Sequence, residues 1–219
     1  MYGSYQGEPV EWRVLDKKDR EILLLSEYGL DAQPFDTSGK SRVDWKDSTI
    51  RKWLNDDFYN SAFSEKEKEN IVESKSEGFE EYNTSMNLTG GGKPYAYLER
   101  ETEDKVFLLS NTELCAYFSE DPYPGCYSDP YAHKELLCYP TAYAKQQLET
   151  RYQTETCGWW LCNHVYEDDS VELVSAYGQG SGTSRENIKA NTKSIAVRPA
   201  MWVTWQSDME MVEANQQVE

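Results

Sequence analysis

Two short apolar segments are the most informative about the fold and function of this chain: Cys157-Gly158-Trp159-Trp160-Leu161 and Val197-Arg198-Pro199-Ala200-Met201-Trp202-Val203. The residues between them are rich in Gly, Ser, Thr, Asn, Tyr and Asp. Rigid strands that flank a long polar, irregular stretch are typical of a scaffold that presents a binding surface. The pattern therefore favours a binding module over an enzyme.

Further strands are predicted on both sides of this region. Apolar or alternating runs indicate them, and a continuous apolar run indicates a strand covered on both faces. The predicted strands are Val10–Asp16, Glu21–Ser26, Lys105–Ser110, Gly158–Leu161, Val171–Ser175 and Ile195–Val203. The charged turn 17–20 joins the first two.

Helices are predicted where capping residues precede apolar spacing. Ser48 is the cap of a helix whose apolar residues recur at helical spacing. Ser64 and Glu67 form a capping box for a short helix that ends near Ile71-Val72, and Ser110 with Glu113 caps another. Pro140 suits the first turn of a last helix. The stripe of the first helix consists of Ile50, Trp53, Leu54 and Phe58.

Together these elements predict a single α+β domain over residues 1–219, with the N- and C-terminal strands adjacent. Residues 73–103, with Gly90-Gly91-Gly92 inside, are expected to be a flexible insertion or loop. Arg198 is expected to be buried and to hold a carboxylate or backbone carbonyls. The expected core residues are Trp12, Leu24, Trp53, Leu54, Phe107, Leu108, Trp160 and Trp202.

The charge of the chain excludes some partners. Lys plus Arg number 22 against 39 Asp plus Glu, for a net charge of −17. Such a field repels phosphate backbones and anionic lipid, so we expect no nucleic-acid partner and no membrane insertion. No signal peptide is visible. A cytoplasmic protein and a module of a virion or cell surface both stay open.

The sequence shows no strong catalytic or metal-binding motif. The two histidines, His133 and His164, lack the setting of a catalytic triad. We therefore expect no catalytic residue, no metal and no cofactor. The cysteines lack zinc-site spacing and are expected to be free thiols, although a disulfide among them stays open. They are Cys115, Cys126, Cys138, Cys157 and Cys162.

An ordered series of motifs resembles a bacterial and phage domain family of unknown function. The series comprises Glu11-Trp12-Arg13-Val14-Leu15, Ser48-Thr49-Ile50-Arg51-Lys52-Trp53-Leu54-Asn55, Gly158-Trp159-Trp160-Leu161 and Val197-Arg198-Pro199-Ala200-Met201-Trp202. That family is similar to the C-type-lectin-like fold, which includes formylglycine-generating enzymes and the variable proteins of diversity-generating retroelements. The resemblance implies a C-type-lectin-like domain with a small antiparallel or mixed sheet, two or three helices and long loops.

The resemblance also points to a ligand-binding region at residues 157–203. The family continues Arg-Ser-Pro after Trp-Trp-Leu, whereas this chain has Cys162-Asn163-His164-Val165-Tyr166. Those types, like those of antibody paratopes, suit a variable recognition surface. We expect a protein or glycan ligand to bind Cys162, Asn163, His164, Tyr166, Asp168, Tyr177, Ser184, Arg185, Asn187 and Asn191, all projecting outward.

Two alternatives stay open. One is an enzyme related to the formylglycine-generating fold, which would need a reactive cysteine pair; Cys157 and Cys162 fall on opposite faces of a strand and do not form one. The other is a structural module of a larger surface protein, which would expose apolar surface to a partner chain.

Overall fold

The computed structural model describes residues 1–40, 43–75, 102–118, 134–149, 155–164, 171–179 and 189–205. They form an α+β fold with antiparallel sheets, as predicted. The main sheet has the order β3-β4-β8-β5, and every pair in it is antiparallel. Its strands are β3 (Trp12–Lys18), β4 (Glu21–Ser26), β8 (Ala200–Thr204) and β5 (Ile71–Val72).

The two central strands of this sheet, β4 and β8, are buried and contribute to the hydrophobic core. β4 pairs with β8 from Glu21↔Thr204 to Leu25↔Ala200, which confirms that strands from the two ends of the chain are adjacent. Burial of the run from Ile22 to Ser26 confirms that this strand is covered on both faces. The edge strand β3 is half-exposed and contains a register shift between Val14 and Asp16. Such irregular, charged edges resist pairing with another chain.

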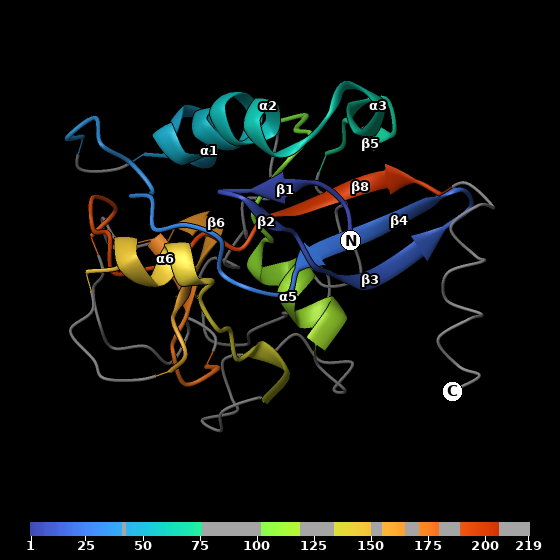
Figure 1. The fold of residues 1–219 in the computed structure, drawn as a ribbon. Coiled ribbons are helices and arrows are strands. Elements are labelled where there is room, and N and C mark those ends of the chain that lie inside the picture. Colours follow the sequence, from blue (N-terminus) through green and yellow to red (C-terminus); the bar gives the residue numbers. More distant parts are fainter. Residues whose placement is uncertain are drawn as a thin grey trace, which may run out of the picture.

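A helical layer lies against this sheet (Figure 1). After the 3₁₀ turn η1 (Trp45–Asp47) come α1 (Thr49–Trp53), the π-helical segment η2 (Leu54–Phe58) and α2 (Tyr59–Ala62). Ser48 caps α1, as predicted, because its side chain accepts from the Arg51 amide. Ile50, Leu54 and Phe58 are buried as the stripe requires. The π-helical segment was not predicted.

Short elements complete the layer. The capping box at Ser64 and Glu67 is present at the start of α3 (Glu65–Lys68), which confirms that prediction. Ile71-Val72 does not end this helix but forms β5 beside β8, because pairing with a central strand outweighs local propensity. The predicted strand Lys105–Ser110 is wrong in part: Val106 to Ser110 are buried, but within the described residues the segment has a single Phe107↔Ala200 bridge and no continuous ladder.

The remaining helices begin near the predicted positions. α5 (Asn111–Phe118) has the expected reciprocal bonds between Ser110 and Glu113. α6 (Ala142–Gln147) is capped by Thr141, so Pro140 lies just before the helix and not in its first turn. Pro140 instead bridges to Gly29.

A second, two-stranded sheet lies beyond the end of the main sheet, beside α6 (Figure 1). It consists of β6 (Trp159–His164) and β7 (Val171–Val174). The 3₁₀ turn η3 (Lys134–Leu136) contacts β6 through a hydrogen bond from Trp159 to the Leu136 carbonyl. Single bridges extend it: Trp159 pairs with Ala196, and Val197 pairs with Asp31. At the N-terminus, β1 (Ser4–Tyr5) and β2 (Glu8–Pro9) form a small hairpin.

The core contains most of the predicted residues. Leu24, Leu54, Phe107, Leu108, Trp160 and Trp202 are buried. Trp12 and Trp53 are only partly buried and pack against the core from its rim. The expected loop at 73–103 falls largely outside the described residues.

Candidate ligand-binding surface

Trp159 and Trp160 anchor the second sheet. Both are fully buried, and each indole N–H donates to a distant backbone carbonyl: Trp159 to Leu136 at 3.1 Å and Trp160 to Gln33 at 3.1 Å. A buried indole needs such a partner, and the bond fixes the ring. These two side chains therefore tie β6 to two segments that are far away in the sequence.

Arg198 connects Trp159 of the second sheet to the backbone at the end of β4. It is fully buried, as predicted, and its Nε donates to the Ser26 carbonyl at 2.9 Å while Nη2 reaches the Glu27 carbonyl at 3.4 Å. Its guanidinium lies 4.9 Å from the centre of the Trp159 ring. Desolvation by burial lowers its pKa, with smaller contributions from neighbouring charges. The expected backbone carbonyl contacts are confirmed.

The predicted ligand-binding residues divide into four groups, of which the last is the buried pair Cys162 and Asn163. Tyr177, 55% exposed, follows β7, and Asn191 is exposed in the turn before Ala196. His164 ends β6 opposite Val171. Outside the described residues lie Tyr166, Asp168, Ser184, Arg185 and Asn187.

For Cys162 and Asn163 the expected outward projection is wrong: they are 3% and 4% exposed. β6 is paired at both edges, with β7 on one side and with the segment before α5 on the other, where the Cys162 amide donates to the Leu109 carbonyl at 3.1 Å. Consecutive residues from Trp159 to Asn163 are all buried, so both faces of the strand are covered and alternation along it exposes neither side chain. The sequence alone does not show this neighbour, because the contact joins segments far apart in the chain.

A buried polar cluster takes the place of the expected exposed one. The Asn163 side-chain oxygen accepts from the Asn111 amide at 2.7 Å, and Asn111 Nδ2 donates to Glu172 Oε2 at 2.8 Å. We call Asn111, Asn163 and Glu172 the polar cluster. It joins the first residue of α5 to both strands of the second sheet.

Glu172 is the unusual member of this cluster. It is 6% exposed, and desolvation by burial raises its pKa to about 7, although the Asn111 hydrogen bond opposes the rise. A buried carboxyl group that titrates near neutrality is a frequent mark of functional sites. It can donate a hydrogen bond when protonated and attract a cationic group when ionised. The sequence held one signal that our prediction missed, a lone acid in the apolar strand Val171-Glu172-Leu173-Val174.

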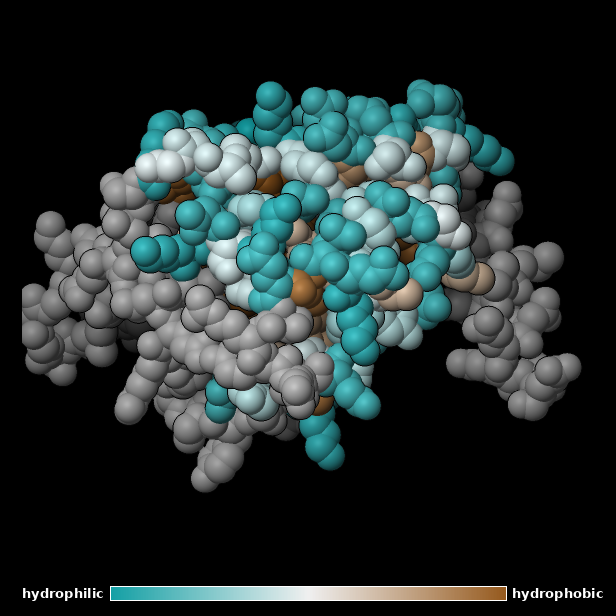
Figure 2. All heavy atoms as spheres, turned by 60° about the vertical axis from the view of Figure 1, so that its left-hand side comes forward, coloured by the Kyte–Doolittle hydropathy of each residue, from teal (hydrophilic) through white to brown (hydrophobic). Residues whose placement is uncertain are grey.

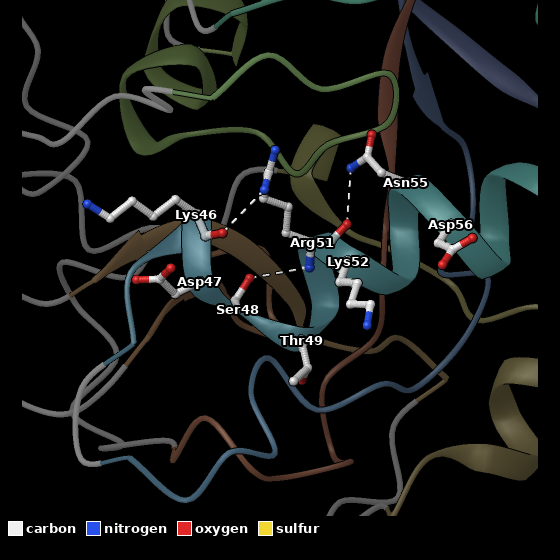
Figure 3. A pocket seen from close by; sticks show the side chains of 8 residues that line it. All are labelled: Lys46, Asp47, Ser48, Thr49, Arg51, Lys52, Asn55 and Asp56. Atoms are coloured by element: carbon white, nitrogen blue, oxygen red, sulfur yellow. Dashed lines mark hydrogen bonds between the residues drawn. The ribbon is translucent and has the colours of Figure 1, made fainter.

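A second polar region lies at the start of α1. Eight residues line an open hollow of about 500 Å³ there (Figure 3). Arg51 Nε contacts buried Asp104 at 2.6 Å, and the Asn55 side chain bonds the backbone of Lys105 and Val106. Because these groups and the Ser48 cap are occupied in tying the helix to the segment after residue 103, we assign this region a structural role.

Neither a metal centre nor a membrane span is found in the part of the chain that the structure describes. No set of three or more His, Cys, Asp or Glu side chains there is placed to hold a metal ion. No helix there is long and apolar enough to cross a bilayer.

Comparison with known proteins places the chain in a family. The family model for a domain of unknown function (DUF6273) matches residues 19–205, which is most of the chain. The protein therefore belongs to this family, and the motifs in the second sheet and in β8 lie inside the matched region. Neither the curated proteins nor the solved structures contain a significant match.

Proposed function

We propose that this domain is a non-catalytic recognition module of C-type-lectin-like type, which binds a protein or glycan ligand at the second sheet. The observation that carries the proposal is the contrast between a rigid, buried scaffold and the polar residues that adjoin it. Trp159 and Trp160 are immobilised by packing and by their indole hydrogen bonds, while Tyr177 and Asn191 beside the same sheet are exposed. Tyrosine offers contact area at low entropic cost, and asparagine adapts its hydrogen bonds.

The described surface also favours recognition over a structural, apolar interface. The face turned forward in Figure 2 is mostly hydrophilic where its residues are described, with only small hydrophobic areas. A module that packs permanently against a partner chain would show a contiguous apolar patch.

A glycan array and a displayed peptide library, each screened with the intact chain, test the proposal. We expect a hit whose binding weakens at least tenfold when Tyr177 and Asn191 are both replaced by Ala, with the melting temperature nearly unchanged. Lys145→Ala, an exposed residue of α6, is the matched control and should bind like the wild type. A hit that the double variant binds unchanged would contradict this placement of the surface.

Diversification by a retroelement is a finer proposal and has a separate test. Sequencing of the encoding locus should reveal a reverse-transcriptase gene and an adenine-mutated copy of the codons for the segment after Leu161. If that copy is missing, diversification is wrong, while recognition still stands on the binding screen.

One observation favours the enzyme alternative: Glu172, with a pKa of about 7, has the protonation behaviour of a general acid or base. A formylglycine-generating activity would be tested with a cysteine-containing sulfatase-type peptide, and the expected product is the aldehyde. If the wild type converts the peptide no faster than Glu172→Gln does, a catalytic role for Glu172 is excluded.

A further inference from the structure

Two buried thiols, Cys138 and Cys157, meet at the start of β6. The Cys157 amide donates to the Cys138 carbonyl at 2.8 Å, and Cys157 Sγ lies 3.5 Å from the same oxygen. Residues paired across such a backbone bond have Cα atoms about 5 Å apart, which is inside the range that a disulfide spans. Both residues are free cysteines, 1% and 6% exposed.

Gly29 shows that the two sulfurs face the same space. A Cβ atom on this glycine would lie 3.2 Å from Cys157 Sγ and 3.6 Å from Cys138 Sγ. It would also lie 2.7 Å from the Ala196 Cβ, which is too close. The absence of a side chain at Gly29 therefore allows both thiols to approach each other beneath the second sheet.

Arg198 provides the electrostatic environment of the pair. Within the described part of the chain its buried Nη1 has no hydrogen-bond partner, although Nε and Nη2 are bonded. A buried cation that is only partly compensated is costly, and a nearby thiolate offsets that cost. The guanidinium lowers the pKa of Cys138, after the larger effect of the Cys157 thiol, whereas the pKa of Cys157 is raised, mainly by Cys138. Cys157 therefore holds its proton more tightly than Cys138 does.

We propose that Cys138 and Cys157 are a redox-active pair that closes reversibly into a disulfide, with small-molecule disulfides such as glutathione disulfide as the oxidant. This inference goes beyond ligand recognition and does not depend on it. Cys162 does not belong to the pair, since its Sγ contacts the Asn163 side chain at 3.8 Å on the strand itself.

The reaction proceeds by thiol–disulfide exchange. Cys138, whose pKa is lowered, attacks one sulfur of the small disulfide as the thiolate. The S–S bond of the oxidant breaks, and one small thiolate leaves. That thiolate takes the proton from Cys157, whose sulfur then attacks Cys138 Sγ and expels the second small thiolate, which is protonated by water. Two small thiols and one protein disulfide result, so the pair is oxidised by two electrons and the oxidant is reduced.

The test is equilibration of the native full-length chain in a series of glutathione redox buffers. After acid quenching, free thiols are alkylated in denaturant and the linked peptides are mapped by mass spectrometry. We expect a peptide that joins Cys138 to Cys157, formed in the oxidising buffers and lost in the reducing ones. Because the crosslink closes the loop 138–157, oxidation should also raise the melting temperature by about 5 °C or more.

Two variants serve as controls. Cys157→Ser should form no such linkage, and its melting temperature should not respond to the buffer. Cys162→Ser, which alters another buried cysteine, should behave like the wild type. The proposal is overturned if both thiols stay alkylated in the most oxidising buffer, if either pairs with another cysteine, or if the linkage forms only after unfolding.

Discussion

Glu172 occupies a position in β7 where the neighbouring side chains are apolar and buried. The hydrogen bond that it accepts from Asn111 satisfies only part of the capacity of an ionised carboxylate. Burial therefore costs the charged form more than the neutral form. The consequence is a folded-state proton affinity higher than that of the unfolded chain.

This affinity predicts a pH-dependent stability with a defined sign. The pKa of Glu172 rises from 4.5 to about 7 on folding, so between these values the folded state binds more protons than the unfolded state. The contribution of Glu172 is fully present below pH 4.5 and is lost as the pH rises through 7. Glu172→Gln should therefore be more stable than the wild type at pH 8, by up to about 3 kcal/mol.

Urea unfolding at a series of pH values measures this effect. Glu149→Gln, at an exposed position just after α6, removes the same charge and should keep the wild-type pH profile. An identical profile for wild type and Glu172→Gln would show that Glu172 titrates normally.

At the scale of elements, Asn55 connects the helical layer to the segment after residue 103. Its Oδ1 accepts from the amides of Lys105 and Val106 at 2.8 and 3.2 Å, and its Nδ2 donates to the Val106 carbonyl at 2.9 Å. One side chain thus provides hydrogen-bond partners for the backbone of two successive residues, Lys105 and Val106. Figure 3 shows Asn55 at the edge of the α1 region.

We expect Asn55→Ala to destabilise the fold by about 2–4 kcal/mol, because it leaves several backbone groups without partners. Asn60→Ala removes two exposed side-chain contacts, to Asp56 and Lys68, and should cost less than about 0.5 kcal/mol. Chemical denaturation of both variants measures the difference. Equal losses would mean that water replaces the Asn55 bonds.

Trp160 and Tyr177, one buried and one exposed, allow a related comparison. Trp160→Ala should cost about 3–5 kcal/mol, since it removes a fully buried ring and its bond to Gln33. Tyr177→Ala, at a 55% exposed position, should stay within about 0.5 kcal/mol. Thermal melting distinguishes them. If Tyr177→Ala is as damaging as Trp160→Ala, Tyr177 is a structural residue and the recognition proposal loses support.

Local signals predicted the elements better than they predicted the site. The caps at Ser48, Ser64 and Ser110 were read correctly because each bond lies within one turn of chain. The burial of Cys162 and Asn163 was missed, because the segment that covers β6 is more than fifty residues away in the sequence. The proximity of Cys138 to Cys157, 19 positions apart, was also missed, because the spacing of the cysteines does not reveal which of them meet in the fold.

At the scale of the whole molecule, the net charge of −17 dominates the electrostatics. Self-repulsion of such a chain opposes the compact state, and salt screens it. We expect the melting temperature to rise when sodium chloride is increased from about 20 to about 500 mM, with most of the rise below about 150 mM. A falling melting temperature would mean that ion pairs such as Arg51–Asp104 outweigh the repulsion.

The order of strands in the main sheet also affects how the protein is made. β8 lies between β4 and β5, yet it is the last of the four strands along the chain. On the ribosome, the apolar residues of β4 therefore emerge long before the strand that covers their open side. Until β8 has emerged, the β4 edge that will pair with it is open, so we expect the chain to be most prone to wrong strand pairing during this stage of synthesis.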